Sequence, residues 1–173
     1  MKGVIIYKGK YGATKQYAEW LGEELGFPVF TADNIDKDLL NLYDVFILGS
    51  SVYIGKLQIK KFLYNNIDLL RYKKIYFFQV AGSPPEEKEK RMQFNRSSIP
   101  SSLIDKCEFY YLPGRLNIEK LSWWDRFMLK MGARLAKTQE EKHAMTINYD
   151  QVKKEYLGPL IKSARSLNPE YAF

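Results

Sequence analysis

The chain has 173 residues, of which 46% are apolar and 15% aromatic, so we expect residues 1–173 to form one domain with a substantial core. No apolar run approaches the roughly 18 residues of a membrane-spanning helix, and the N-terminal apolar stretch is too short for a signal peptide. Cys107 is the single cysteine, which excludes an intrachain disulfide framework and favours a reducing, cytoplasmic location. With His143 as the single histidine, the composition also argues against a zinc site and against a Cys–His catalytic pair.

The net charge of +7 favours anionic partners, such as an anionic lipid surface or an acidic small substrate. The basic residues form small groups, for example Lys56, Lys60 and Lys61, and not the long basic tail of a nucleic-acid-binding arm. We therefore expect no nucleic-acid partner. Whether the chain forms a homodimer stays open at this level.

Short apolar runs predict five strands, at residues 3–7, 28–31, 44–49, 74–80 and 107–112. The third run is apolar through its middle, as in a sheet that is covered on both faces. Because helices alternate with these strands, the sequence predicts an α/β fold with a parallel sheet and right-handed crossovers. An early phosphate-type loop favours the strand order 2-1-3-4-5.

Apolar residues at helical spacing predict the helices between these strands. The first helix begins at about Ala13 and ends at Gly26, a residue type that favours the position just after a helix. Another helix is predicted over residues 59–67. The last helix is expected to start near Asp150, and Pro159 should kink or interrupt it.

In a sheet of this order, the ligand lies beyond the carboxyl ends of the strands, between strands 1 and 3. The loops that would surround it are residues 8–14, 50–56, 80–86 and 113–118. We therefore expect the functional residues to come from these four loops.

The loop after the first strand has features that suit a phosphate. It leads from a strand into a helix N-terminus, where unpaired backbone N–H groups and the helix dipole favour an anion. Gly9 and Gly12 allow close approach of the backbone, Thr14 can add a hydroxyl donor, and Lys8 and Lys10 add positive charge. The simpler alternative is a tight turn with a helix cap.

Three other anion-binding motifs fit this loop less well. A P-loop requires Gly-Lys followed by Ser or Thr, whereas Tyr11 follows Gly9-Lys10. A dinucleotide-binding loop requires three glycines, and only Gly9 and Gly12 are present. A phospho-acceptor receiver domain would need acidic residues at the ends of strands 1 and 3, where this chain has none.

Residues 9–14 resemble the flavodoxin phosphate loop, Ser/Thr-x-Thr-Gly-x-Thr, and match it at Gly12 and Thr14. The sequence departs from it at Gly9 and Tyr11, which removes two hydroxyl contacts but leaves the backbone donors. The resemblance implies a flavodoxin-like three-layer sandwich with a five-stranded parallel sheet and FMN as the cofactor.

Three further stretches resemble the menaquinone-dependent protoporphyrinogen oxidase family, which has a flavodoxin domain. Residues 48–55, Leu-Gly-Ser-Ser-Val-Tyr-Ile-Gly, are similar to that family's Gly-Ala-Ser-Ile-Arg-Tyr-Gly loop. Residues 113–116, Pro-Gly-Arg-Leu, resemble its Gly-Ala-Leu turn. Residues 123–130, Trp-Trp-Asp-Arg-Phe-Met-Leu-Lys, resemble its Trp-Tyr-Asp-Arg-Phe-Met-Ile-Lys, a segment that ordinary flavodoxins lack.

The resemblance implies which residues contact FMN. The phosphate would lie at the first loop, the flavin ring beside the second loop with Tyr53 or Ile54 at its face, and backbone of the two later loops at its edges. The implied cofactor-binding residues are Gly9, Lys10, Tyr11, Gly12, Ala13, Thr14, Ser50, Ser51, Val52, Tyr53, Ile54, Gly55, Ala81, Gly82, Gly114, Arg115 and Leu116. No catalytic acid or base is assigned.

The resemblance implies an oxidoreductase that transfers electrons from a tetrapyrrole through FMN to a quinone acceptor, in the context of heme biosynthesis. Two alternatives stay open. One is a flavodoxin-type electron carrier, although such proteins are acidic and this chain has a charge of +7. The other is a binding module that retains the fold with a weakened flavin site, because Gly9 and Tyr11 depart from the motif.

The segment around residues 121–135 admits two interpretations. Apolar residues step by three and four along one helix face: Leu121, Trp124, Met128, Met131 and Leu135. This stripe would pack on the sheet, as most such stripes do. Alternatively, residues 117–136 form a wall for a large apolar substrate or rest peripherally on the inner face of a membrane, with Trp123 exposed.

Overall fold

The fold is organised around a sheet in the order β2-β1-β3-β5-β6, seen in a computed structural model that describes residues 1–82, 88–136 and 138–167. The strands are β1 (Gly3–Lys8), β2 (Val29–Thr31), β3 (Val45–Tyr53), β5 (Lys74–Ala81) and β6 (Cys107–Pro113). All neighbours on this path are parallel. Counted among these five strands, the order is the predicted 2-1-3-4-5, which confirms the flavodoxin-like α/β fold.

A sixth strand was not predicted. β3 continues beyond Gly49 to Tyr53, and the chain then turns back as β4 (Lys56–Leu57), antiparallel to β3. A strand of two residues is too short to show an alternation of apolar and polar side chains, so the sequence pattern does not predict β4.

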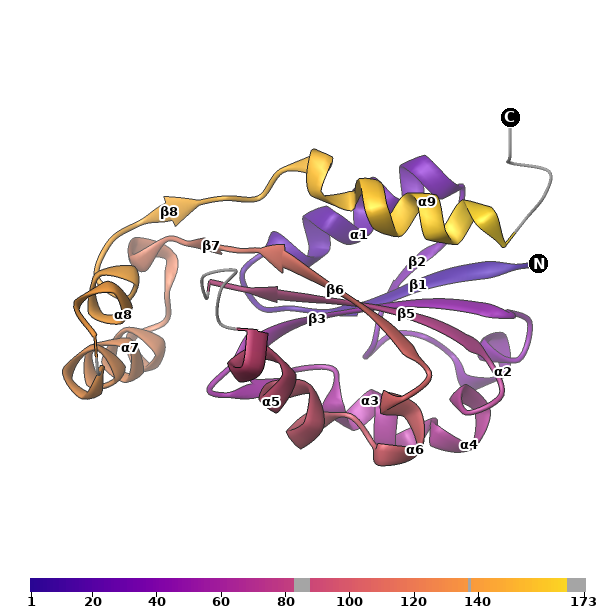
Figure 1. Cartoon of the computed structure of the whole chain (residues 1–173), viewed down its shortest axis with the longest axis horizontal. Helices are drawn as coiled ribbons and strands as arrows, with labels where there is room; N and C mark the ends of the chain where they lie inside the picture. The colour runs from indigo at the N-terminus through magenta and orange to yellow at the C-terminus, as the bar shows by residue number, and fades with distance from the viewer. Residues whose placement is uncertain (83–87, 137, 168–173) are drawn as a thin grey trace.

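Helices cover both faces of the sheet, which gives three layers (Figure 1). One face carries α1 (Ala13–Leu25) and α9 (Gly158–Ser166), and the other carries α2 (Lys37–Leu40), α3 (Lys60–Asn65), α4 (Ile67–Leu70), α5 (Lys88–Ser98) and α6 (Ser101–Ile104). Because successive side chains of a strand point to opposite faces, neighbouring residues of the central strands enter different cores. Ile5 and Ile47 pack with α1 and α9, whereas Ile6 and Leu48 pack on the opposite side.

The helix predictions are confirmed in part. Gly26 follows α1 in the left-handed region, with φ of 66°, as expected of a residue just after a helix. The helix expected over residues 59–67 is divided at Asn66 into α3 and α4. The last helix begins at Gly158 and not near Asp150, so Pro159 lies in its first turn and neither kinks nor interrupts it.

The chain makes a long excursion between β6 and α9 that extends beyond one end of the sheet (Figure 1). It contains β7 (Arg115–Leu116), the 3-10 helix η1 (Ile118–Lys120), α7 (Trp123–Leu135), α8 (Gln139–Ala144), β8 (Tyr149–Asp150) and the 3-10 helix η2 (Lys154–Leu157). β7 and β8 pair antiparallel, which closes the excursion at its base. Within the described residues, no helix is long and apolar enough to cross a bilayer.

Candidate functional site

A cavity of about 510 Å³ lies at the carboxyl ends of the parallel strands, between these ends and the excursion that connects β6 to α9. Its volume is within the range of ordinary ligand sites. The four predicted loops all contribute to its lining, through Lys10, Tyr11, Ala13, Thr14, Ser51, Val52, Tyr53, Ile54, Ala81, Gly82, Gly114, Arg115 and Leu116. The remaining predicted residues, Gly9, Gly12, Ser50 and Gly55, do not line it. Residues 83–86 of the third loop lie outside the described residues.

The first turn of α1 contains an unsatisfied donor, the hydroxyl of Thr14. The Thr14 side chain is 1% exposed, and its Oγ1 has no hydrogen-bond partner among the described residues. A buried hydroxyl without a partner costs free energy, so it favours a ligand that can accept its hydrogen. Gly12, with φ of 86°, is the residue just before the helix. Because glycine has no side chain, it cannot cap the helix, and it does not compete with a ligand for the backbone N–H groups of the helix N-terminus.

Gly9 is required by the position of Thr14. A Cβ atom at Gly9 would lie 2.5 Å from Thr14 Oγ1 and 2.7 Å from Thr14 Cβ, both too close. The sequence departure at this position is therefore compensated locally. The loop places the Thr14 hydroxyl where a larger residue 9 would stand, and it retains the backbone donors of the helix N-terminus.

Ser50 stabilises the second loop, residues 50–56, from the buried side that faces away from the cavity. The Ser50 hydroxyl accepts a hydrogen bond from the Ile59 backbone N–H at 3.2 Å and donates to the Ser51 carbonyl at 3.0 Å. The side chain is buried, so it braces the loop and does not face the cavity. Beyond it, the hairpin turn has positive φ at both Ile54 (48°) and Gly55 (71°), which is unfavourable for a β-branched residue.

Asp125 joins three parts of the site. Its carboxylate accepts hydrogen bonds from the hydroxyls of Tyr11 and Tyr53, and Lys10 Nζ lies 2.6 Å from its Oδ2. The Asp125 side chain is 6% exposed, and its backbone N–H donates to Ser122 Oγ at the start of α7. The bond to Asp125 raises the pKa of Lys10. One carboxylate therefore links the phosphate loop, the 50–55 loop and α7.

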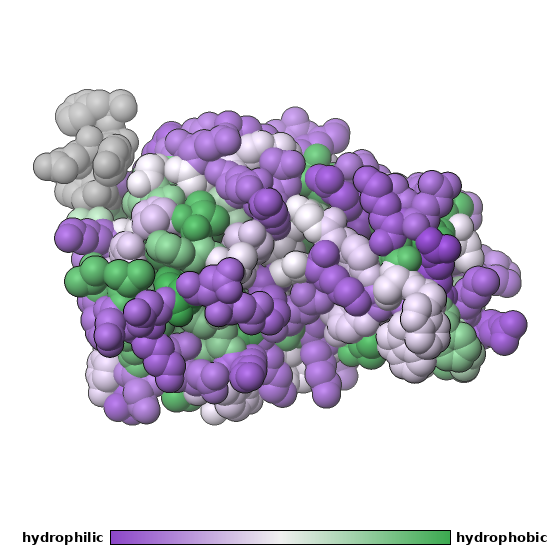
Figure 2. Space-filling model, turned by 180° about the vertical axis from the view of Figure 1, so that it is seen from behind, coloured by the Kyte–Doolittle hydropathy of each residue, from purple (hydrophilic) through white to green (hydrophobic). Residues whose placement is uncertain are grey.

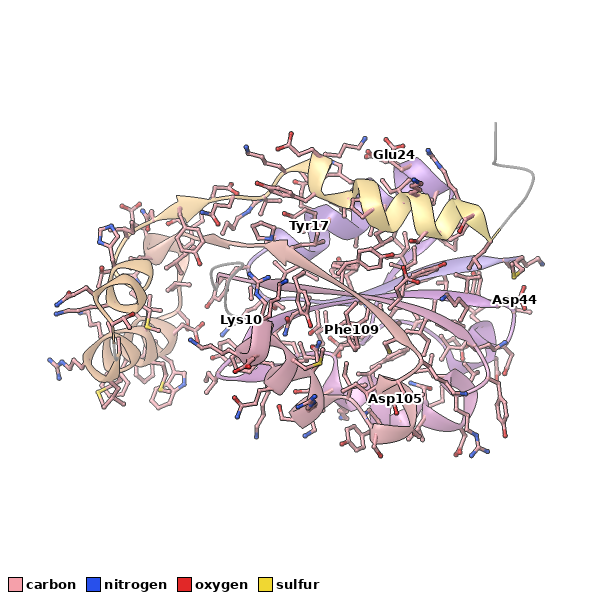
Figure 3. The ribbon with its side chains drawn as sticks, viewed as in Figure 1. Lys10, Tyr17, Glu24, Asp44, Asp105 and Phe109 are labelled. Atoms are coloured by element: carbon pink, nitrogen blue, oxygen red, sulfur yellow. The ribbon has the colours of Figure 1, made fainter. Side chains whose placement is uncertain are left out.

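The Lys10 ammonium also lies near two aromatic rings. It is 4.8 Å from the centroid of Tyr53 and 5.5 Å from that of Tyr11, in addition to its contact with Asp125. In Figure 3, Lys10 lies at the end of the sheet that faces α7. The positive charge of this loop is thus directed toward Asp125 as well as toward the cavity.

The excursion forms the far wall of the cavity, and this wall is mainly apolar. The stripe predicted to pack on the sheet lines the cavity instead, through Leu121, Met128, Met131 and Leu135. Trp124 does not line the cavity and is partly exposed, so the prediction of a stripe against the sheet was wrong. Helical periodicity predicts which side chains share one face of a helix. It does not predict what that face packs against, because this depends on the tertiary structure.

Sequence reasoning missed Gln58, Met145 and Tyr149 of the lining altogether. Val80 belongs to a predicted ligand loop, and the α7 side of the lining falls within residues 117–136, the alternative wall for an apolar substrate, but neither was named among the cofactor-binding residues. The lining residues on the α7 side are Leu121, Asp125, Met128, Leu129, Met131, Gly132 and Leu135. Tyr149 approaches the third loop so closely that a Cβ at Gly82 would stand 1.8 Å from its hydroxyl oxygen. Burial raises the pKa of this tyrosine. For Asp125 a signal existed, because it is a charged residue four positions after Leu121 and three before Met128, which places it beside the apolar stripe.

Two known proteins are similar to this chain in sequence. An uncharacterized protein of Methanocaldococcus jannaschii is 29% identical over 109 residues, 62% of this chain and 67% of that protein. The protoporphyrinogen IX dehydrogenase (quinone) of Escherichia coli K12 is 24% identical over 166 residues, 88% of this chain and 91% of the relative.

The fold and the family are also matched directly. The structure of oxidised flavodoxin 2 from Bacillus cereus superposes with a TM-score of 0.51 at 17% identity, over 84% of this chain and 93% of that one. The model of the flavodoxin domain family matches residues 4–143. The match includes the loop of residues 8–14, the 50–55 loop and all of α7, and the chain therefore belongs to the flavodoxin domain family.

Proposed function

We propose that this protein binds FMN in the cavity at the carboxyl ends of its strands and acts as an FMN-dependent oxidoreductase. The observation that carries the proposal is the buried Thr14 hydroxyl, which has no partner among the described residues and lies at the N-terminus of α1. A phosphate group would satisfy this donor together with the backbone N–H groups of the helix terminus. Residues of this kind fit the phosphate of FMN.

Different residues around the cavity would hold different parts of the flavin. The first loop would hold the phosphate through Thr14 and backbone donors. Tyr53 and Ile54 would flank the ring, and Gly82 and Gly114 would allow the backbone to come close to its edges. FMN, when bound, supplies the redox chemistry, and the protein supplies binding, orientation and exclusion of water.

We propose an electron donor of the tetrapyrrole class and a quinone acceptor, as in the dehydrogenase from Escherichia coli that this chain resembles. The apolar wall from α7 favours an enzyme over a carrier, because it adds a chamber for an apolar molecule beside the loops that would hold the flavin.

The first test is reconstitution of the purified protein with FMN, followed by its absorbance spectrum. We expect a bound flavin with a shifted spectrum that is bleached by dithionite, and we expect oxidation of protoporphyrinogen with a soluble quinone. Bound, reducible FMN without turnover would favour the electron carrier. A protein that retains no FMN would favour the binding module and refute the proposal.

We also propose that the outer face of α7 contacts an anionic membrane surface. Trp123 is 79% exposed, and its ring is edge-on to that of Trp124, whose ring lies 5.7 Å from that of Phe127 between centroids, tilted by 30°. The exposed basic residues Lys130 and Arg134 lie on the same helix. In Figure 2, apolar and pale residues gather among hydrophilic ones at the end of the molecule that carries α7. Aromatic and basic side chains together suit an interface with anionic lipids.

Co-sedimentation with vesicles tests this contact. We expect binding to vesicles that contain phosphatidylglycerol, weaker binding to phosphatidylcholine vesicles, and loss of binding in a Trp123→Ser, Phe127→Ser variant. Tyr72→Ser is a matched control, because Tyr72 is also highly exposed but lies on another part of the molecule. Equal binding of the two variants would refute the contact.

A further inference from the structure

A second cavity, of about 600 Å³, adjoins the first one and has a different chemistry. It lies under η1 and the β7–β8 pair. The two cavities share the lining residues Tyr11, Arg115, Leu116, Leu121 and Tyr149. The second cavity is lined in addition by Asn117, Lys120, Asn148 and Asp150. A ligand that extends from one cavity into the other would therefore pass from a mainly apolar environment into a polar one.

The polar groups of the second cavity that are not already engaged are mainly donors. The Asn117 Oδ1 accepts the Glu119 backbone N–H at 3.1 Å, and the Asn148 Oδ1 accepts the Ile118 backbone N–H at 2.8 Å. A backbone N–H can only donate, so the amide oxygen must face it in each case. Among the described residues, the NH₂ group of each of the two asparagines has no hydrogen-bond partner.

The two basic residues of the cavity also have donors to spare. The Lys120 ammonium makes no hydrogen bond or ion pair within the described part of the chain. Arg115 Nε is buried and has no hydrogen bond to any described residue, and the Asp150 Oδ1 atom lies 3.5 Å from it. That oxygen already accepts the Val152 backbone N–H at 3.0 Å. Asp150, the one acidic residue among the described lining residues, is thus partly engaged, whereas the side-chain donors of Lys120 and of the two asparagines are not.

We propose that this second cavity, around Arg115 and Lys120, binds a carboxylate of the ligand whose apolar body occupies the first cavity. The inference rests on the proposed function in that it takes the first cavity as the flavin and substrate chamber. A carboxylate has two acceptor oxygens, and it complements a guanidinium, an ammonium and amide donors. The phosphate of FMN is the other source of such an anion, and the experiment separates the two.

Mesoporphyrin IX and its dimethyl ester are suitable probes, because they share one apolar body and differ in their carboxylates. With the FMN-loaded protein, we expect fluorescence titration to give at least tenfold tighter binding of the free acid. Tenfold corresponds to about 1.4 kcal/mol, which is the lower end for one charge-assisted hydrogen bond. The preference should decrease with added salt.

Lys120→Gln is the test variant, since it removes the charge of an exposed residue without a partner among the described residues. We expect it to weaken the binding of the free acid about tenfold and to leave the ester and FMN affinities within twofold of wild type. Lys162→Gln, on the exposed side of α9, removes the same charge elsewhere and should change neither affinity. Arg115→Gln should reproduce the loss if the variant keeps the wild-type melting temperature.

The inference is wrong if acid and ester bind equally to the wild type, or if the two lysine variants behave alike. It is also wrong if Lys120→Gln weakens FMN but not riboflavin, because the cavity would then serve the cofactor's phosphate. Failure of the proposed function has a separate signature, namely no binding of FMN to the wild type. The porphyrin titrations can still be carried out on that flavin-free protein, and they then judge the second cavity alone.

Discussion

The replacement Thr14→Val should change the stability of the protein and its affinity for FMN in opposite directions. Valine has the shape of threonine without the hydroxyl, so the packing against Gly9 is kept. In the absence of flavin, the buried Oγ1 has no partner within the described residues, and its desolvation is uncompensated. Removing it should leave the free energy of unfolding unchanged or raise it, by up to about 1 kcal/mol.

The affinity for FMN should fall, because the same hydroxyl would donate to a charged phosphate. A hydrogen bond to a charged group contributes roughly 1.5–3 kcal/mol, so the dissociation constant should rise about tenfold to a hundredfold. Urea denaturation of the flavin-free protein measures the first quantity, and quenching of flavin fluorescence measures the second. Riboflavin lacks the phosphate, and its affinity should not change.

Two results would refute this reasoning. One is a clear loss of stability in the flavin-free Thr14→Val protein, which would mean that the hydroxyl is satisfied in the folded state. The other is an unchanged affinity for FMN, which would place the phosphate elsewhere. Thr31→Val, at the end of β2, is a matched control that should alter neither quantity.

Three further predictions concern other parts of the molecule. Asp125→Asn should loosen α7, because the ion pair with Lys10 and the charge-assisted bonds of two tyrosines are lost, and hydrogen exchange in α7 should become faster. Ile54→Asn should raise the free energy of unfolding by about 1 kcal/mol, measured by urea denaturation, because asparagine tolerates the positive φ of this turn better than isoleucine. Burial raises the pKa of Tyr17 to about 12 from 10.0, so the folded state favours the protonated phenol. The stability from Tyr17 is fully present below pH 10 and is lost as the pH rises toward 12, a decrease that Tyr17→Phe should reduce in urea denaturation.

Each of these predictions has a contradictory outcome. Unchanged exchange in Asp125→Asn would show that α7 is held by its apolar contacts alone. A lower melting temperature in Ile54→Asn would show that the apolar side chain contributes more than its backbone strain costs. An identical fall in stability above pH 10 in Tyr17→Phe would assign that fall to other groups, of which Tyr76 and Cys107 have a raised pKa for the same reason.

The contacts of Asp125 are an example of what could not be predicted from the sequence. Its partners Lys10, Tyr11 and Tyr53 come from loops more than seventy residues away in the chain, at separations of 115, 114 and 72 residues. Periodicity and motif spacing act within a window of about 18 residues and carry no information about such pairs. The second cavity could not be predicted from the sequence for the same reason, because it depends on the pairing of β7 with β8, which are more than thirty residues apart in the chain.

The sequence by itself determined the five parallel strands of the main sheet, their order and the loops of the ligand edge, because local patterns predict the strands and the alternation of strands with helices predicts a parallel sheet. Apolar runs, a glycine after α1 and a strand that leads into a helix N-terminus are all read from neighbouring residues. Only the tertiary structure decided which way the stripe of α7 faces, that the Thr14 hydroxyl is buried without a partner among the described residues, and that Asp125 closes the site. These features depend on contacts between distant segments, which form when the chain folds.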